Sequence, residues 1–369
     1  MSIKIATFFL NLIYFVIKLF PTTNKVTFIS RQSNSPSQDA LMLAKELKDK
    51  NSNIKVVMLF KKLDNKIVYC FHIIKQMYHI ATSKTVILDS YCIVISLLKH
   101  KNDLKVVQMW HALGALKRFG YSILDEEEGS SSKLAEMMRM HKGYDVIFTS
   151  SEYCKESFAE AFGYKSDKLK VMSLPRVDLL RSSKYQATKR DEIYTVYPQL
   201  KEKETIVYAP TFRKSDLIVS DTNAIKKLIN EIDKNKYNLV IKVHPLTNLE
   251  ITEERIIVDN CFSTLDMLSV ADYIVLDYSA ILYEAALLNK PLFFYAFDLD
   301  EYTEKRNFYI DYEKEMPGAI CKNANDVTKS IENKIYDVSK VKNFADKYIQ
   351  NQENCTSEMV EYIIQLMGK

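Results

Sequence analysis

Short apolar runs alternate with amphipathic stretches along most of the chain. Runs rich in β-branched residues occur at 25–30, 54–60, 85–90, 104–110, 145–150 and 170–178. The stretches between them, such as 35–50 and 151–162, repeat apolar residues every three or four positions and predict helices. Strands separated by helices in this way predict parallel βαβ units.

A second series of the same kind follows a polar stretch at 183–204, which contains Pro198 and no apolar run. That stretch is the best linker candidate. The second series has expected strands at 205–210, 238–245, 255–259, 272–277 and 291–297. The pattern therefore predicts the α/β class, with two Rossmann-like halves and a cleft between them. We expect domains at 23–185 and 186–345, and a C-terminal helix at 346–369. Ligands of such sheets bind outside the carboxyl ends of the strands.

Residues 1–22 form a separate apolar segment that ends at Pro21. Its core, 5–20, is shorter than the roughly 20 residues that a spanning helix needs. Lys4, Asn11 and Lys18 are spaced by seven and share one stripe of a helix. This pattern favours an amphipathic helix in a membrane interface, with its lysines at the headgroups. Burial against the protein's own core is the alternative.

Composition narrows the classes of function. The chain carries 51 basic and 47 acidic residues, a net charge of +4, which is too balanced to indicate nucleic-acid binding. The six cysteines are scattered without metal-ligand spacing, which is typical of reduced thiols in a cytosolic protein.

His111 is the first candidate for chemistry, in the segment QMWHALGALKRFG at 108–120. It directly follows an expected strand, and Gly114 and Lys117 lie just beyond it. Histidine is the side chain whose ordinary pKa suits proton transfer near neutral pH. A core histidine at a strand end remains the alternative.

His244 is the second candidate, in IKVHPLT at 241–247. It ends an expected strand, and Lys242 lies two residues earlier on the same face. A cation beside an imidazole suits a phosphate group. A histidine packed on Pro245 is the alternative.

The segment 272–295 predicts a compact βαβ unit. Ser279 is expected at the start of its helix, where backbone N–H groups can bind a phosphate, although a simple N-cap role is equally consistent. Glu284 lies further along that helix. Two further strand exits carry Thr211 with Arg213, and Arg176; arginine forks bind phosphates well.

Together these motifs resemble the CDP-glycerol glycerophosphotransferase family of teichoic acid synthesis. The matching elements are Trp110-His111, PRVD at 175–178, APTFR at 209–213, KVHP at 242–245, and the long segment 271–302. The resemblance implies the GT-B arrangement, with no metal and no cofactor. It implies transfer of glycerol phosphate or ribitol phosphate from a CDP-polyol, with release of CMP.

The resemblance also implies roles for individual residues. His111 would be the base that deprotonates the acceptor hydroxyl, and His244 would bind the donor phosphates. Gly114 and Lys117 would lie on the acceptor side. The CDP-polyol pocket would be lined by Trp110, Arg176, Pro210, Thr211, Arg213, Lys242, Ser279, Ala280 and Glu284.

Several positions depart from the family's polymerases. His111 is followed by Ala112-Leu113-Gly114, as in the shorter primase-type members, while Lys242 replaces an arginine, Ala280 a serine and Glu284 an aspartate. The implied partners are CDP-glycerol or CDP-ribitol, and a polyprenyl-diphosphate-linked saccharide as acceptor. The expected location is the cytoplasmic face of the cell membrane, as a peripheral protein, and a homo-oligomer is compatible with this organisation. Two alternatives stay open, a GT-B glycosyltransferase that uses a nucleotide sugar and a non-catalytic membrane-associated scaffold.

Overall fold

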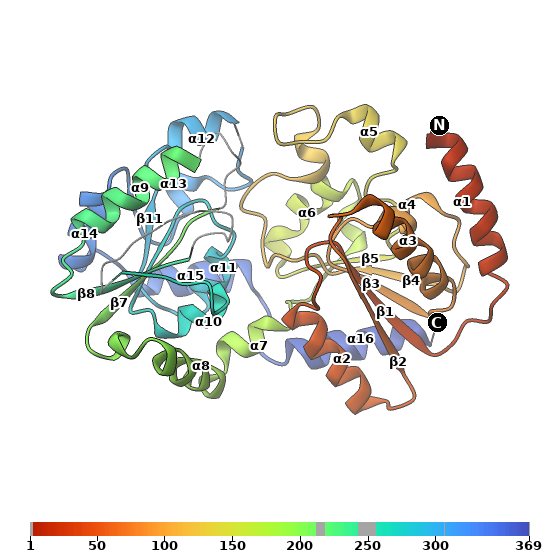
Figure 1. The fold of residues 1–369 in the computed structure, drawn as a ribbon, viewed down its shortest axis with the longest axis horizontal. Coiled ribbons are helices and arrows are strands. Elements are labelled where there is room, and N and C mark those ends of the chain that lie inside the picture. Colours follow the sequence, from red (N-terminus) through yellow and green to blue (C-terminus); the bar gives the residue numbers. More distant parts are fainter. Residues whose placement is uncertain (1–2, 212–217, 243–255, 306, 369) are drawn as a thin grey trace. The chain divides into compact units, whose positions relative to one another are not determined.

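The chain forms two compact units, each built on one parallel sheet (Figure 1). The structure, a computed structural model, describes residues 3–211, 218–242, 256–305 and 307–368. Unit 1 comprises residues 1–113, 119–178 and 350–369, and unit 2 comprises 114–118 and 179–349. The predicted α/β class with two parallel, Rossmann-like sheets is confirmed.

The sheet of unit 1 has six parallel strands in the order β2-β1-β3-β4-β5-β6. They are β1 Lys25–Ser30, β2 Lys55–Phe60, β3 Thr85–Leu88, β4 Lys105–Gln108, β5 Val146–Thr149 and β6 Leu169–Val171. The helices of the same unit are α1 Ile3–Ile17, α2 Gln38–Lys50, α3 Lys66–Ala81, α4 Ile93–Leu97, α5 Ser132–Met137, α6 Lys155–Phe162 and α16 Cys355–Met367. Helix α7, Arg176–Arg181, contains the change from unit 1 to unit 2.

The sheet of unit 2 also has six parallel strands, in the order β12-β11-β10-β7-β8-β9. They are β7 Glu204–Ala209, β8 Tyr237–Ile241, β9 Ile256–Val258, β10 Tyr273–Leu276, β11 Leu292–Tyr295 and β12 Ala319–Cys321. Its helices are α8 Ser183–Val196, α9 Ile218–Glu231, α10 Thr264–Met267, α11 Leu282–Ala286, α12 Leu299–Lys305, α13 Tyr312–Glu315, α14 Ala324–Glu332 and α15 Val338–Tyr348.

Each sheet has one point where the strand order reverses. Counted within unit 2, the order is that of dinucleotide-binding sheets, and its reversal lies between β7 and β10. In unit 1 the reversal lies between β1 and β3. Loops leaving neighbouring strands diverge at such a point and leave a crevice at the carboxyl ends. These two crevices are therefore the places where the fold favours ligand binding.

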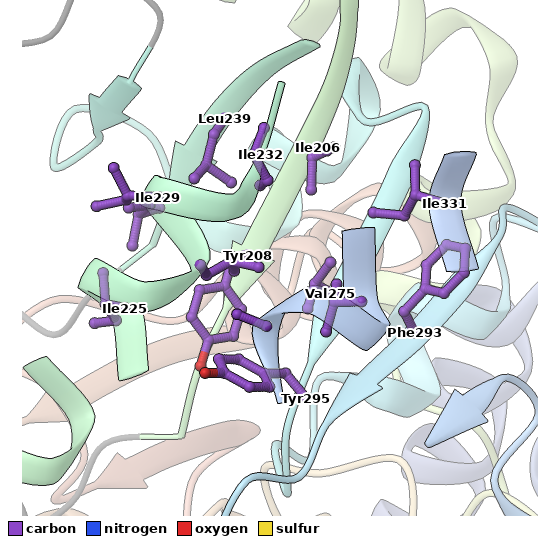
Figure 2. Packing of buried hydrophobic residues seen from close by; sticks show 14 of the residues in the cluster. Ile206, Tyr208, Ile225, Ile229, Ile232, Leu239, Val275, Phe293, Tyr295 and Ile331 are labelled. Atoms are coloured by element: carbon purple, nitrogen blue, oxygen red, sulfur yellow. The ribbon is translucent and has the colours of Figure 1, made fainter. Parts of the chain in front are cut away.

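One hydrophobic cluster of unit 2 covers the face of the sheet that lies against α9 and α14. Side chains from β7, β8, β10 and β11 pack against α9 and α14, and the cluster is almost fully buried (Figure 2). Tyr208 of β7 and Tyr295 of β11 lie side by side, with ring centroids 6.0 Å apart. Parallel sheets covered by helices need a continuous apolar sequence rather than an alternating one.

The linker expected at 183–204 is wrong. Its first part is helix α8, and a 3-10 helix, Pro198–Lys201, follows. The change of unit falls at Asp178–Leu179 rather than near 185, and the C-terminal helix α16 packs on α2 inside unit 1. Helix α8 buries only Ile193, so its sequence has no apolar stripe to reveal it.

The N-terminal helix α1 turns Asn11 and Lys18 toward the protein. Asn11 accepts a hydrogen bond from the Lys99 backbone N–H at 3.2 Å, and the Lys18 ammonium donates to the Lys99 carbonyl at 2.8 Å. Tyr14 is buried and bonds His100 at 2.8 Å. The expectation that this stripe faces outward is therefore wrong for Asn11 and Lys18. No helix in the described part of the chain is long and apolar enough to cross a membrane.

Candidate active site

His111 lies beside the crevice of unit 1, one strand away from the point where the strand order reverses. It follows β4, and its Nδ1 atom is 2.8 Å from the Asp89 carbonyl oxygen, just after β3. A carbonyl oxygen only accepts hydrogen bonds, so Nδ1 must carry the proton. The lone pair of the ring then lies on Nε2, which is the form that a general base requires.

The surroundings keep His111 neutral. Burial lowers the pKa of the imidazole below its ordinary 6.5, the bond to Asp89 opposes this shift, and the positive charge of Arg176 adds to it. A neutral imidazole at physiological pH can accept a proton. The electrostatics of this site therefore suit a base.

Arg176 is held by a buried carboxylate. Its backbone N–H and its Nε donate to Asp39 of α2 at 2.8 Å and 2.9 Å, and a terminal guanidinium nitrogen contacts the same carboxylate. Asp39 is buried, and its ion pair with Arg176 satisfies its charge. Arg176 thus fixes the start of α7 against α2 and adds positive charge near His111.

Trp110 has a strained backbone beside the candidate base. Its φ is +57°, in the left-handed region that non-glycine residues avoid, and its N–H donates to the Gln108 side chain at 2.9 Å. The indole stacks on Phe119 with centroids 5.1 Å apart. Strain of this kind persists where packing enforces it and is frequent at functional sites.

The crevice of unit 2 contains a matching polar contact. Thr211, which follows β7 and Pro210, donates to Asp277 after β10 through its N–H at 2.8 Å and its hydroxyl at 2.7 Å. The Tyr312 hydroxyl donates to the Asp277 carbonyl at 3.0 Å. Asp277 therefore joins the two loops that border the crevice.

Lys242 is bound by protein groups on all three of its protons. The ammonium donates hydrogen bonds to the Asp259 carbonyl at 3.0 Å, the Asp259 carboxylate at 2.6 Å and the Phe262 carbonyl at 2.6 Å. A lysine ammonium has three donors and no more. In this arrangement Lys242 fixes the loop after β9, and a direct phosphate contact would require it to leave one of these partners.

Ser279 is not at a helix start. Helix α11 begins at Leu282 and has only five residues, so it lacks the anion-binding N-terminus that the sequence predicted. Ser279 is half-buried and Ala280 is exposed in the turn before it. Glu284, expected to line the CDP-polyol pocket, is 3% exposed. A carboxylate is rarely buried in this way without a dedicated partner.

Gly114 and Lys117 belong to unit 2 rather than to the half that contains His111. A Cβ on Gly114 would lie 2.4 Å from the Tyr283 ring, so glycine is needed there for close packing. Lys117 pairs with Phe308 in an antiparallel bridge, and its ammonium lies 5.1 Å from the Tyr302 ring centroid.

Two predicted site residues, His244 and Arg213, lie outside the described residues. In the described part of the chain, His111, Trp110 and Arg176 belong to unit 1, while the remaining predicted site residues belong to unit 2. The sequence analysis missed Asp89, Asp259 and Asp277. Each directly follows a strand, as His111 nearly does, so their position alone could have identified them.

Comparisons with known proteins identify the family of this chain. Residues 12–365 match the CDP-Glycerol:Poly(glycerophosphate) glycerophosphotransferase family. The chain belongs to this family.

The chain is similar to curated family members over most of its length. It is 29% identical to the teichoic acid ribitol-phosphate primase of Bacillus spizizenii, over 91% of this chain and 90% of that protein. It is 28% identical to the teichoic acid glycerol-phosphate primase of Bacillus subtilis, over 80% and 77%. The resemblance to this family, including its primase-type members, is confirmed.

A solved structure shares the fold. The wall teichoic acid polymerase TagF superposes with a TM-score of 0.76 at 19% identity, over 97% of this chain and 93% of that one. In this chain, polar residues lie at strand ends beside the crevices of both sheets. The crevice of unit 1 contains the candidate base, and that of unit 2 contains the Thr211–Asp277 contact.

Proposed function

We propose that this protein transfers glycerol phosphate or ribitol phosphate from a CDP-polyol to a hydroxyl group of a lipid-linked acceptor, with release of CMP. The observation that carries this proposal is the His111 imidazole, which is held by Asp89 with Nε2 available in a chain of the glycerophosphotransferase family. A polyprenyl-diphosphate-linked saccharide is the acceptor class that we propose.

The proposed reaction consists of one proton transfer and one substitution at phosphorus. His111 Nε2 takes the proton of the acceptor hydroxyl as its oxygen attacks the polyol-bearing phosphorus. The bond from that phosphorus to the bridging oxygen of the diphosphate breaks, and CMP leaves with the bridging oxygen. An unaided hydroxyl is a poor nucleophile near neutral pH, so the base lowers the barrier to attack.

The donor side needs positive charge where negative charge develops on the leaving group. We assign this role to His244 and Arg213, which the family resemblance places in the CDP-polyol pocket with Pro210, Ser279, Ala280 and Glu284. Thr211 and Lys242 act as positioning residues in this proposal, because their donors are used by Asp277, Asp259 and Phe262.

Peripheral contact with the cytoplasmic face of the membrane fits the apolar surface of unit 1. Helices α1 and α3 pack on each other and expose large apolar side chains. These are Ile5, Phe8, Phe9, Leu12, Ile13, Phe15 and Val16 of α1, and Ile67, Val68, Phe71, Ile74 and Tyr78 of α3. Exposed large apolar side chains that gather on one surface mark an interaction site. Lipid-linked acceptors reside in membranes, which such a surface can contact. In this proposal the apolar face, not the lysine stripe, enters the interface.

The test is nucleotide release from a panel of CDP-glycerol, CDP-ribitol and UDP-sugars with a lipid-linked saccharide acceptor. We expect acceptor-dependent CMP release from a CDP-polyol and no UDP release. The matched control is His72→Ala, a half-buried histidine on α3, which should leave the rate unchanged while His111→Ala abolishes most of it. Release of UDP alone would favour a glycosyltransferase, and no release from any donor would favour a non-catalytic scaffold.

A further inference from the structure

The chain segment that follows His111 leaves unit 1 and then returns to it. Residues 114–118 belong to unit 2, whereas the residues before them, up to 113, and the residues after them, from 119, belong to unit 1. Ala112 and Leu113 alone separate His111 from this segment. A link of two residues has a short reach, so the place where the segment is held in unit 2 limits where His111 can lie.

Backbone hydrogen bonds hold the segment in unit 2. The Tyr309 N–H donates to the Leu116 carbonyl at 3.0 Å, and the Arg118 N–H donates to the Asn307 carbonyl at 3.0 Å. Two bonds in this order, on either side of one bridged pair of residues, are the pattern of a short antiparallel ladder. The segment is therefore paired with the stretch of chain that follows α12.

Phe308 anchors this pairing inside unit 2. It lies opposite Lys117 in the bridge, and its ring stacks on the rings of Tyr302 and Tyr312, with centroids 5.9 Å and 5.1 Å away. The Tyr312 hydroxyl in turn donates to the carbonyl of Asp277, which borders the crevice of unit 2. The segment after His111 is thus fixed to the aromatic cluster beside that crevice.

In unit 1 the two ends of the excursion meet beside His111. Phe119, the first residue back in unit 1, stacks on the Trp110 indole with an angle of 16° between the rings. Trp110 has a φ of +57° and precedes His111 directly. A strained backbone persists where the surrounding structure enforces it. The ring stack constrains this turn from one side, and the segment paired in unit 2 constrains it from the other.

We propose that residues 114–118 form a positioning strap, which holds the Trp110–His111 turn in its active conformation through the pairing with 307–309. The inference rests on the proposed function for the role of His111. It makes Phe308 a positioning residue that acts through the strap. A displacement of a reacting group by about 1 Å can lower a rate by about 100-fold, so the strap should control kcat rather than donor binding.

The test uses Trp110 as a reporter, because it is the single tryptophan of the chain and belongs to the turn itself. Phe308→Ala removes the anchor. The matched control is Tyr336→Ala, which removes another half-buried ring of unit 2, one that packs on Tyr273 and Phe293. Acrylamide quenching of tryptophan fluorescence and urea unfolding are measured on the full chain without substrates. The values of kcat and KM are measured with a CDP-polyol and a lipid-linked saccharide.

We expect Phe308→Ala to increase the quenching of Trp110 and to lower kcat at least about tenfold, with the KM for the CDP-polyol within about twofold of wild type. Tyr336→Ala should lose a similar amount of stability, because it also truncates a packed ring, but keep the wild-type quenching and kcat. Equal changes in both variants, or unchanged quenching in Phe308→Ala, would overturn the inference. Because quenching needs no substrate, absence of turnover in the wild type would count against the proposed function alone.

A second variant keeps the anchor and lengthens the link. Two glycines inserted between Leu113 and Gly114 should increase the quenching and lower kcat as Phe308→Ala does, because the strap then no longer constrains the turn. The same insertion between Ser52 and Asn53, in an exposed turn of unit 1, is the control and should behave as the wild type does. This pair decides the question if Phe308→Ala does not fold, and wild-type quenching in the lengthened link would again overturn the inference.

Discussion

At the scale of single residues, the site depends on which nitrogen of His111 is available. The Asp89 carbonyl fixes the proton on Nδ1, and burial keeps the ring neutral. Asp89 is itself buried, and burial raises the pKa of its carboxyl group above the ordinary value. A substitution of Asp89 would keep the bond from its backbone carbonyl to His111. A substitution that removes the His111 imidazole would remove the base.

The pH dependence of the reaction should report this environment. A lowered pKa keeps His111 unprotonated at pH values where an ordinary histidine is already charged, so the acidic limb of kcat should have its midpoint below the ordinary 6.5. His111→Ala should lower kcat by about 10²–10⁴-fold and abolish this acidic limb. An acidic midpoint above 6.5, or a limb that persists in the variant, would contradict the assignment.

Gly114 gives a prediction for stability. Because a Cβ there would lie 2.4 Å from the Tyr283 ring, Gly114→Ala should lower the free energy of unfolding by about 1–3 kcal/mol through overpacking. Gly368→Ala is the control, since the nearest atom to its added Cβ is 3.7 Å away. Urea unfolding of both variants measures the difference, and equal stability of the two would refute the packing argument.

At the scale of elements, buried ion pairs fix the loops that leave the strands. Arg176 joins the start of α7 to α2 through Asp39, and Lys242 joins the end of β8 to the loop after β9 through Asp259. Removing one partner of such a pair leaves an uncompensated buried charge. The resemblance to the family assigns both cations to the donor pocket, whereas the structure gives each a structural partner.

Lys242→Met separates these two roles. We expect it to lower the free energy of unfolding by about 3–5 kcal/mol, because Asp259 stays buried without its partner. Lys236→Met is the control in the same unit, where the ion pairs with Asp233 and Glu332 are exposed and should contribute little. Unchanged stability together with a raised KM for the CDP-polyol would instead indicate a phosphate contact by Lys242.

The α1–α3 surface gives a prediction for membrane binding. Phe71 is 72% exposed on α3, and Phe71→Glu places a charge in the proposed interface without disturbing the core. Binding to vesicles of anionic lipid, measured by co-sedimentation, should fall several-fold, because a charged group is costly to insert. Ile335→Glu, at an exposed apolar residue of unit 2, should bind as the wild type does. Equal loss in both variants, or in neither, would reject this surface.

At the scale of the whole molecule, the sequence predicted the two sheets well and their boundaries less well. All eleven expected strand segments overlap the strands β1 to β11, because apolar β-branched runs are required in covered parallel sheets. Strand β12, Ala319–Cys321, was missed: it lies between Gly318 and Lys322, and Ile320 is its single β-branched residue. The local pattern that predicts a strand also shows which residues directly follow it, and this is how the candidate site residues were found.

The rest depended on contacts between distant parts of the chain. The return of α16 to unit 1 rests on its packing against α2 and on bonds from the Cys355 and Thr356 backbone N–H groups to Asp178, which no local pattern encodes. The ion pair of Lys242 with Asp259 and the hydrogen bond from Lys18 to the Lys99 carbonyl also join residues that no local pattern relates. Sequence located the candidate side chains, and the structure determined which of them have protein partners.

The most direct test of the account is the mass of the product. A defined lipid-linked saccharide is incubated with CDP-glycerol or CDP-ribitol, and the acceptor is analysed by mass spectrometry with wild type and His111→Ala. The account predicts that the wild-type product gains the mass of one or more polyol phosphate units, with one CMP released per unit, and that His111→Ala gives little product. An acceptor that gains a sugar without phosphate, or that remains unchanged with both donors, would contradict it.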